Sequence, residues 1–282
     1  MKIKEYPGSF FRSLEMRFFL RKSRKVYRHT HQADCVVSLT SIPNRLPQIE
    51  LTIASLLAQS TPPKKIILWL NDSLQDALPR SLASLQRENF AIRFRQGNSS
   101  HRKLIFTLSE FSEDVIVTCD DDVMYSKNWL ESLMADHFQH PAAVLCHECR
   151  EVSHDHKGHL KPYREWTTIT APGYTAEGLV PIGYGGVLYP PRSLHRDTLN
   201  EALFMELAPK ADDLWFRAMS YLQGTEVRKC TQPSEKPIPI IGAKGSSLAK
   251  TNIKADGNRQ QWLAICRHYD INPGFVEPDC ST

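Results

Sequence analysis

Three consecutive carboxylates, Asp120, Asp121 and Asp122, directly follow the apolar run at residues 115–119. Adjacent negative charges repel one another, so they are costly at the end of a buried strand unless a cation lies beside them. Carboxylate oxygens suit Mg²⁺ and Mn²⁺, whose protein sites commonly leave positions to water and substrate phosphates. The triplet therefore predicts a divalent metal site, and a charged turn that caps the next helix is the alternative.

The segments before the triplet alternate between two hydrophobic patterns. Four short apolar runs predict strands, at residues 35–40, 65–70, 91–95 and 114–119. Three intervening segments have the spacing of helices, at residues 46–57, 78–88 and 102–110. This alternation predicts an α/β fold with a mostly parallel sheet flanked by helices on both faces.

Polar residues follow the first two of these strands, Thr40 and Ser41 after the first and Asn71 and Asp72 after the second. Ligands of parallel sheets bind beyond the carboxyl ends of the strands. We therefore expect these side chains to share one edge of the sheet with the triplet. Ordinary turns and helix caps use the same residue types and are the alternative.

The alternation decays beyond a helix expected at residues 127–138. Residues 142–195 are rich in Gly, Pro and His and contain Tyr184, Gly185 and Gly186. Glycines of this kind allow tight turns or the close approach of backbone to a ligand. The remaining expected elements are a helix, a strand and a final helix, at residues 209–222, 238–241 and 258–269.

Basic residues gather at the N-terminus of the 282-residue chain. Residues 1–32 carry nine Lys or Arg and two Glu, a net charge of +7, whereas the other 250 residues carry −3. Phe11, Leu14 and Phe18 recur at helical spacing among the arginines, which predicts a basic amphipathic extension over residues 1–33 that lies on an anionic membrane surface. Binding of nucleic acid, and packing on a partner protein or on the chain's own core, are the alternatives.

The seven cysteines lack the spacing of a disulfide framework, so reduced thiols in a cytosolic compartment are expected. No apolar run approaches the roughly 20 residues that cross a bilayer. These features and the basic helix predict a cytoplasmic protein attached peripherally to the inner face of the plasma membrane. Cys146 and Cys149, with His154, His156 and His159, could hold zinc, although a histidine-rich surface hairpin is favoured.

Five short motifs occur in a specific order, at residues 37–45 (VSLTSIPNR), 102–104 (RKL), 117–122 (VTCDDD), 185–189 (GGVLY) and 211–215 (ADDLW). With them, the chain resembles nucleotide-sugar-dependent glycosyltransferases of the GT-A fold over residues 34–265. More narrowly, it is similar to bacterial family 2-like enzymes that build lipopolysaccharide or capsule. The resemblance implies a single domain at 34–282, divided into a nucleotide-sugar half at 34–125 and an acceptor half with a C-terminal closing region at 126–282.

The resemblance also implies a role for each charged residue of these motifs. Asp122, with Asp120, would hold Mn²⁺ or Mg²⁺, while Asp120 would also face the ribose or donor sugar and Asp121 could help either task. Lys103 and Arg102 would contact the donor diphosphate. Some relatives supply a His ligand from the closing region, but no His lies there before His268, so the third protein ligand is unassigned.

The remaining site residues are assigned in the same way. Thr40, Ser41 and either Asn71 or Asp72 would contact the nucleotide base and ribose. Tyr184, Gly185 and Gly186 would shape the acceptor site.

Asp213, with Asp212 as second choice, occupies the position of the general base of inverting members. Removal of the proton from the acceptor hydroxyl contributes about 10² to 10⁴ in rate. Acidic residues in the first turn of a helix are also favoured by the helix dipole, which is the structural alternative.

The expected function is metal-dependent sugar transfer, from a UDP-sugar in the first instance, to a glycan or lipid-linked acceptor in cell-surface polysaccharide synthesis. One rival is a sugar nucleotidyltransferase, but those enzymes open with a Gly-rich phosphate loop and residues 40–44 contain no glycine. The other is a non-enzymatic nucleotide- or nucleic-acid-binding protein that uses the basic arm. Retention of configuration at the transferred sugar also stays open.

Overall fold

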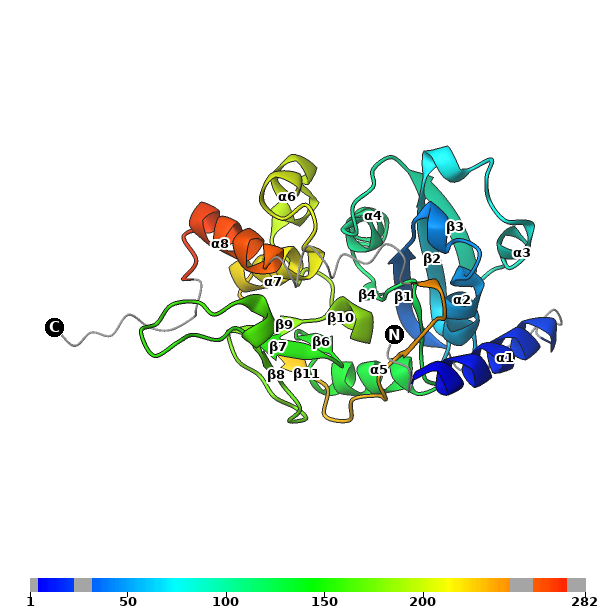
Figure 1. Cartoon of the computed structure of the whole chain (residues 1–282), viewed down its shortest axis with the longest axis horizontal. Helices are drawn as coiled ribbons and strands as arrows, with labels where there is room; N and C mark the ends of the chain where they lie inside the picture. The colour runs from blue at the N-terminus through cyan, green and yellow to red at the C-terminus, as the bar shows by residue number, and fades with distance from the viewer. Residues whose placement is uncertain (1–4, 23–31, 244–255, 273–282) are drawn as a thin grey trace.

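The computed structural model describes residues 5–22, 32–243 and 256–272, which are arranged around one large sheet (Figure 1). Seven strands form this sheet in the order β11-β6-β10-β4-β1-β2-β3. Their bounds are β1 Ala33–Thr40, β2 Pro63–Asn71, β3 Phe90–Arg95, β4 Val115–Thr118, β6 Val144–Cys146, β10 Val187–Tyr189 and β11 Val227–Lys229. Among the described pairs of this sheet, only those of β10 with β4 and β6 are antiparallel. The mostly parallel α/β sheet is thereby confirmed.

Helices cover both faces of the sheet. They are α2 Ile49–Leu57, α4 Arg102–Glu110, α5 Trp129–Gln139, α6 Glu201–Leu207, α7 Asp212–Leu222 and α8 Gly257–Tyr269. Successive residues of a strand point to opposite faces of the sheet, so a strand can contribute side chains to two hydrophobic cores. In β4, Val117 packs in the core with α2 and α5, whereas Ile116 packs in the core with α4, α7 and α8.

The helix expected at residues 78–88 is wrong in length, because α3 comprises only Arg80–Ala83. The chain turns back into β3 instead of continuing the helix. The backbones of Arg87 and Phe90 exchange two hydrogen bonds of 3.0 Å, which fixes this turn.

Two smaller sheets complete the fold. The first pairs β5 Val123–Met124 with β12 Ile238–Pro239 in antiparallel fashion, immediately after the aspartate triplet. The second has the order β8-β7-β9, with bounds β7 Cys149–Glu151, β8 Thr167–Thr168 and β9 Leu179–Pro181. The β5–β12 sheet therefore joins the residues that follow the triplet to residues 238–239.

Helix α1 Tyr6–Lys22 packs on α2 and β12. Met16, which is 1% exposed, enters a small core, and the hydroxyl of Ser9 donates a 2.6 Å hydrogen bond to the carbonyl of Pro239. Arg12 donates to the carbonyl of Tyr125 at 2.8 Å. The alternative that this helix packs on the chain's own core is therefore confirmed for its inner side.

The expected apolar face of α1 points the other way. Phe11, Leu14 and Phe18 are 69%, 50% and 57% exposed. Leu14 and Met16 are two residues apart and so point in nearly opposite directions on a helix. The prediction of a one-sided amphipathic helix is wrong, because α1 is apolar on both its inner and outer sides.

The histidine-rich segment forms a hairpin that is closed by a bridge between His154 and Leu160. Cys146 and Cys149 are buried and form no disulfide. Across residues 5–22, 32–243 and 256–272, no three His, Cys, Asp or Glu side chains are grouped so that they could hold a metal ion. The zinc alternative gains no support from this arrangement. No helix in the same ranges combines the length and the apolar character needed to cross a bilayer.

Candidate active site

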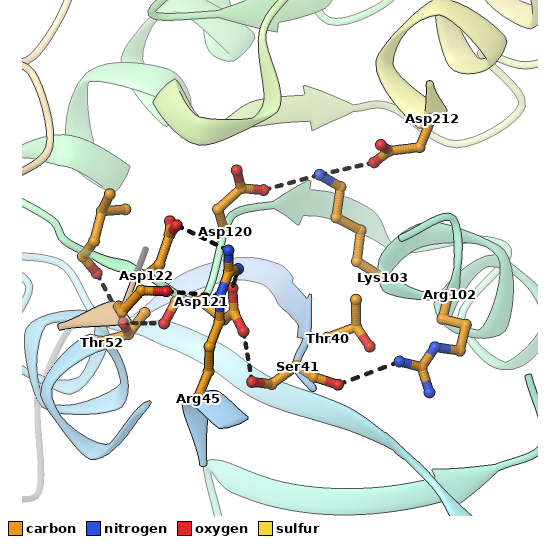
Figure 2. A network of polar contacts seen from close by, with 12 residues as sticks. Thr40, Ser41, Arg45, Thr52, Arg102, Lys103, Asp120, Asp121, Asp122 and Asp212 are labelled. Carbon is orange, nitrogen blue, oxygen red and sulfur yellow. Dashed lines mark hydrogen bonds and ion pairs between the residues drawn. The ribbon is translucent and has the colours of Figure 1, made fainter. Parts of the chain in front are cut away.

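The carboxyl ends of β1 and β4, the 97–100 loop, the turn before β10 and the first turn of α7 surround a cavity of about 580 Å³. Parallel strands place their carboxyl ends on the same edge of a sheet, which is why residues far apart in the chain meet here. Thr40, Ser41, the three aspartates of the triplet, Lys103, Asp212 and Asp213 all line this cavity, as expected. Figure 2 shows the polar network that joins most of them.

Asp121 is the most buried member of the triplet, at 5% exposure. The hydroxyl of Ser41 donates to its Oδ2 at 2.5 Å, and the guanidinium of Arg45 pairs with its Oδ1. Burial raises the pKa of Asp121, although Arg45 and Ser41 act to lower it. Asp121 is therefore occupied in holding the strand end together.

Asp120 and Asp122 are more open, with side chains 34% and 19% exposed. Asp120 accepts a 3.0 Å hydrogen bond from Lys103, and Asp122 lies 3.2 Å from Nη2 of Arg45. Both carboxylates line the cavity and already attract a cation each. They fit Mg²⁺ or Mn²⁺ in a site completed by diphosphate and water, as two-carboxylate sites for these ions usually are.

Lys103 joins the strand end to α7. Its ammonium lies 3.0 Å from Oδ1 of Asp120, 3.0 Å from Oδ2 of Asp212 and 4.0 Å from Oδ1 of Asp213, and its side chain is only 6% exposed. Burial alone would lower the pKa of Lys103, but the three carboxylates raise it well above its ordinary value. Lys103 is thus a fixed cation between the two acidic groups.

The two aspartates of α7 have different surroundings. Asp212 accepts a 2.7 Å hydrogen bond from the hydroxyl of Ser100 and pairs closely with Lys103, so its pKa is lowered despite burial. Asp213 accepts a 3.0 Å hydrogen bond from the backbone N–H of Gly183. Burial and the charge of Asp212 raise the pKa of Asp213 to about 7, which suits a general base that works near neutral pH.

Gly183 is a site residue that the sequence analysis missed. A Cβ added there would lie 2.7 Å from both Oδ1 of Asp213 and Nζ of Lys103, so only glycine lets the backbone approach these charges. The signal in the sequence was the first glycine of the run that also contains Gly185 and Gly186.

Tyr184 lines the cavity, whereas Gly185 and Gly186 are not among the lining residues. A Cβ on Gly185 would lie 2.8 Å from Cβ of Glu148. Gly186 has φ +98° and a Cβ there would lie 2.5 Å from Nε1 of Trp129. These two glycines shape the turn through tight packing, and their expected role in the acceptor site stays a prediction.

Tyr125 was also missed by the sequence analysis. Its hydroxyl accepts a 2.9 Å hydrogen bond from the backbone N–H of Asp120 and donates one of 3.1 Å to the carbonyl of Tyr184. The buried ring therefore links the end of β4 to the turn that carries Tyr184.

Asn71 and Asp72 do not line the cavity. Asn71 instead donates hydrogen bonds of 2.8 Å to the carbonyl of Gly97 and 3.1 Å to Oδ1 of Asn98, so it supports the 97–100 loop from behind. Asp72 is exposed in the turn after β2. Contact of Asn71 or Asp72 with the nucleotide base stays a prediction.

Arg102 holds two loops together. Its guanidinium donates hydrogen bonds to the carbonyls of Ser41, Ser99 and Gly97, at 3.2, 3.1 and 2.9 Å. At 2% exposure it contributes positive charge to the cavity wall but offers little surface to a diphosphate. Arg45, which the sequence analysis left without a role, is the more accessible guanidinium at 17%.

A mostly parallel sheet with acidic residues at its carboxyl edge, facing a second acidic pair across a cavity, is the arrangement expected of a GT-A-type nucleotide-sugar glycosyltransferase. Residues 40–194 match the profile of Glycosyl transferase family 2, which is more than half of the chain, and the protein belongs to this family. It is therefore a glycosyltransferase, and the nucleotidyltransferase and non-enzymatic rivals are set aside.

Solved structures give a similar fold. The mannosyltransferase PcManGT from Pyrobaculum calidifontis, in complex with GDP-Man and Mn²⁺, is 13% identical, with a TM-score of 0.51 over 94% of this chain and 73% of that chain. TarS of S. aureus, in complex with UDP-GlcNAc, is 15% identical, with a TM-score of 0.49 over 83% of this chain and 67% of that chain. The comparison with curated proteins gives no match. At these identities, the likeness to PcManGT shows the fold alone.

Proposed function

We propose that this glycosyltransferase is metal-dependent and inverting, and that it transfers a sugar from a UDP-sugar to an acceptor hydroxyl, with Asp213 as the general base. One observation carries the proposal. The cavity of about 580 Å³ has the open carboxylates Asp120 and Asp122 on one wall and Asp213, with a pKa of about 7, on another. An inverting transfer needs these two groups on either side of the anomeric carbon, one for the metal-bound diphosphate and one for the acceptor proton.

The chain's own residues supply the proton transfer in this proposal. Asp213 accepts the proton of the acceptor hydroxyl through one carboxylate oxygen, while the N–H of Gly183 holds the other at 3.0 Å. Asp212 stays ionised beside Lys103, so the proton goes to Asp213. When bound, Mn²⁺ or Mg²⁺ would neutralise the charge that develops on the leaving diphosphate. The presence of Mn²⁺ and a nucleotide sugar in the PcManGT complex is consistent with this choice of cofactor.

We further propose a peripheral position on an anionic membrane, close to a glycan or lipid-linked acceptor for cell-surface polysaccharide. The support is the outer side of α1, where Tyr6, Phe10, Phe11, Leu14 and Phe18 are 48% to 69% exposed. Arg17, Arg21 and Lys22 are exposed on the same helix. One apolar side of α1 is buried against the core of the protein. The other apolar side is exposed and could insert into a membrane whose headgroups are anionic.

The experiment that tests the catalytic proposal is a panel of nucleotide sugars with Mn²⁺, scored for hydrolysis or transfer. We expect turnover with at least one donor. Asp122→Ala should lose on the order of 10²-fold or more in rate, because the metal supplies several kcal/mol of charge stabilisation. Asp213→Asn should lose about 10² to 10⁴ in transfer.

Asp76→Asn, an exposed carboxylate outside the cavity, is the matched control and should keep the parent rate. Inactivity with every donor, or full turnover by Asp122→Ala, would refute the metal-dependent proposal. Retention of the anomeric configuration in the product would refute the role of Asp213 as base.

A further inference from the structure

We propose that Arg45 and the divalent cation bind the carboxylate of Asp122 alternately. The guanidinium holds this carboxylate when no donor is bound, and it moves to the donor diphosphate when the cation takes Asp122. The inference rests on the metal-dependent function proposed above. It adds a donor-binding role for a residue outside the aspartate triplet.

Arg45 makes three separate contacts beside the triplet, two of them with aspartates that Figure 2 labels. It pairs with Oδ1 of Asp121 through Nη1 and lies 3.2 Å from Oδ2 of Asp122 through Nη2. Its Nε donates a 3.2 Å hydrogen bond to the carbonyl of Ala243. The guanidinium therefore connects two adjacent carboxylates and the segment after β12, and it also lines the cavity.

The three contacts are unequal. Asp121 is 5% exposed and is fixed from its other side by Ser41, so its pairing with Arg45 is the buried one. Asp122 is 19% exposed and its contact with Arg45 is longer, so this ion pair should break more easily than the pair with Asp121. Because the guanidinium is a rigid plane, Nη2 can reach the cavity only if the whole group rotates, and the buried pairing with Asp121 would act as the pivot of that rotation.

The backbone of the triplet is held independently of these side chains. Thr52 donates hydrogen bonds of 3.0 Å to the carbonyl of Asp121 and 2.8 Å to that of Val123. The N–H of Ile240 donates to the carbonyl of Asp122 at 2.9 Å. Exchange at Asp122 can therefore proceed by rotation of side chains, without movement of the strand end.

Charge balance explains why cation and diphosphate should enter together. The described lining of the cavity contains more carboxylates than cations, namely Asp120, Asp121, Asp122, Asp212 and Asp213 against Arg45, Arg102, Lys103 and Lys210. A divalent cation alone would have to displace a guanidinium that gains no new partner. A diphosphate supplies that partner, because phosphate oxygens match the fork of an arginine. Binding of the two ligands is then positively coupled.

The test measures binding rather than turnover. Mn²⁺ affinity is determined by electron paramagnetic resonance of free Mn²⁺, with and without inorganic pyrophosphate or UDP, for the full chain and for Arg45→Met. Removal of the competing guanidinium should tighten the binding of Mn²⁺ alone by about fivefold, the size of a partly exposed ion pair. The same change should weaken the enhancement of Mn²⁺ binding by pyrophosphate by about fivefold or more.

Arg95→Met removes a guanidinium that pairs with Glu110 at 3.0 Å outside the cavity, and both affinities should stay unchanged in this control. If Arg45→Met leaves Asp121 unpaired and the protein unstable, the double variant Arg45→Met with Asp121→Asn removes the buried charge and should show the same two shifts. Weaker or equal Mn²⁺ binding in the absence of pyrophosphate, or unchanged coupling, would overturn the exchange. If the parent protein binds no Mn²⁺ even in the presence of pyrophosphate or UDP, the metal-dependent function itself is refuted, and the exchange with it.

Discussion

Nζ of Lys103 lies 3.0 Å from Oδ2 of Asp212, so one of the two adjacent acids of α7 is bound to a fixed cation. The other, Asp213, is 4.0 Å from the same nitrogen and more exposed, at 27% against 11%. This asymmetry separates the two carboxylates into a permanent anion and a group that exchanges its proton near neutral pH.

The pH dependence of activity should follow from that separation. Because burial and Asp212 raise the pKa of Asp213 to about 7, kcat/KM should rise as the pH increases through about 7. Asp212→Asn removes the neighbouring negative charge, so the acidic limb should move to lower pH by about one unit. The measurement is a pH profile of kcat/KM, with Asp76→Asn as the control. An acidic limb that stays in place or moves upward would contradict the role of Asp212.

The free energy of unfolding should show the titration of the same carboxyl group. Ionisation of Asp213, which favours activity, should lower the stability of the fold. The pKa of Asp213 is raised from 3.8 to about 7 in the folded protein, so the folded state binds this proton more tightly than the unfolded state. The stabilisation from the protonated carboxyl is therefore complete below about pH 4 and is lost as the pH rises through 7.

Asp213→Asn should then unfold in urea with a free energy about 1 to 2 kcal/mol higher than the parent at pH 8, and nearly equal below about pH 4. The side chain is 27% exposed, so solvent screening reduces the full linkage value. An equal difference at both pH values would show that Asp213 titrates normally. In that case the folded protein would hold the ionised Asp213 without any cost in stability.

Gly183 should tolerate no side chain. Gly183→Ala would place a Cβ 2.7 Å from the ammonium of Lys103 and from Oδ1 of Asp213, and would push apart the two groups that the backbone N–H now aligns. We expect a loss of about 10²-fold in kcat, since small displacements of positioned groups have effects of this size. Gly8→Ala on α1, where no atom lies within 4 Å of the added Cβ, is the control and should keep full activity. A fully active Gly183→Ala would contradict the arrangement of Asp213.

Much of this site followed from the sequence because strand ends converge. Once residues 35–40 and 114–119 are strands of one parallel sheet, Ser41 and Asp121 must lie near each other. Their hydrogen bond of 2.5 Å bears this out. The placement of Asp213 in the site was implied by the resemblance to glycosyltransferases and not by any strand end.

The partners of Arg45 could not be found in that way. Its short helical turn, Pro43–Arg45, precedes the triplet by more than 70 residues, and no pattern in the chain reports which carboxylate a single arginine meets. The need for a glycine at position 183 could not be predicted for a similar reason. The close approach that requires a glycine there is made by side chains from α4 and α7.

Helix α1 shows a different limit of sequence patterns. The spacing of Phe11, Leu14 and Phe18 identifies one face of a helix, but it says nothing about what that face meets. Met16, on the other side, buries itself in the chain's own core. The prediction of a helix was right. The prediction of a single apolar side was wrong, because α2 and β12 offer an apolar surface on which the other side of the helix packs.

The membrane proposal can therefore be tested only with substitutions on the outer side of α1. The triple variant Phe11→Ser, Leu14→Ser and Phe18→Ser removes exposed apolar surface and should leave the melting temperature nearly unchanged. It should reduce co-sedimentation with vesicles that contain anionic phospholipid by about tenfold or more, because each buried apolar side chain contributes about 1.5 to 3 kcal/mol when it leaves water.

Met16→Ala is the matched control on the inner side of the same helix. It creates a cavity under α1 and should cost about 2 to 5 kcal/mol of stability, while the outer side keeps its apolar residues. Deletion of the helix would mix these two effects, since it would also uncover Met124 and Ile240. If the triple variant sediments with anionic vesicles as well as the parent does, the outer side of α1 is not the membrane contact. Sedimentation that is independent of anionic lipid would equally exclude the basic residues of α1 from the contact.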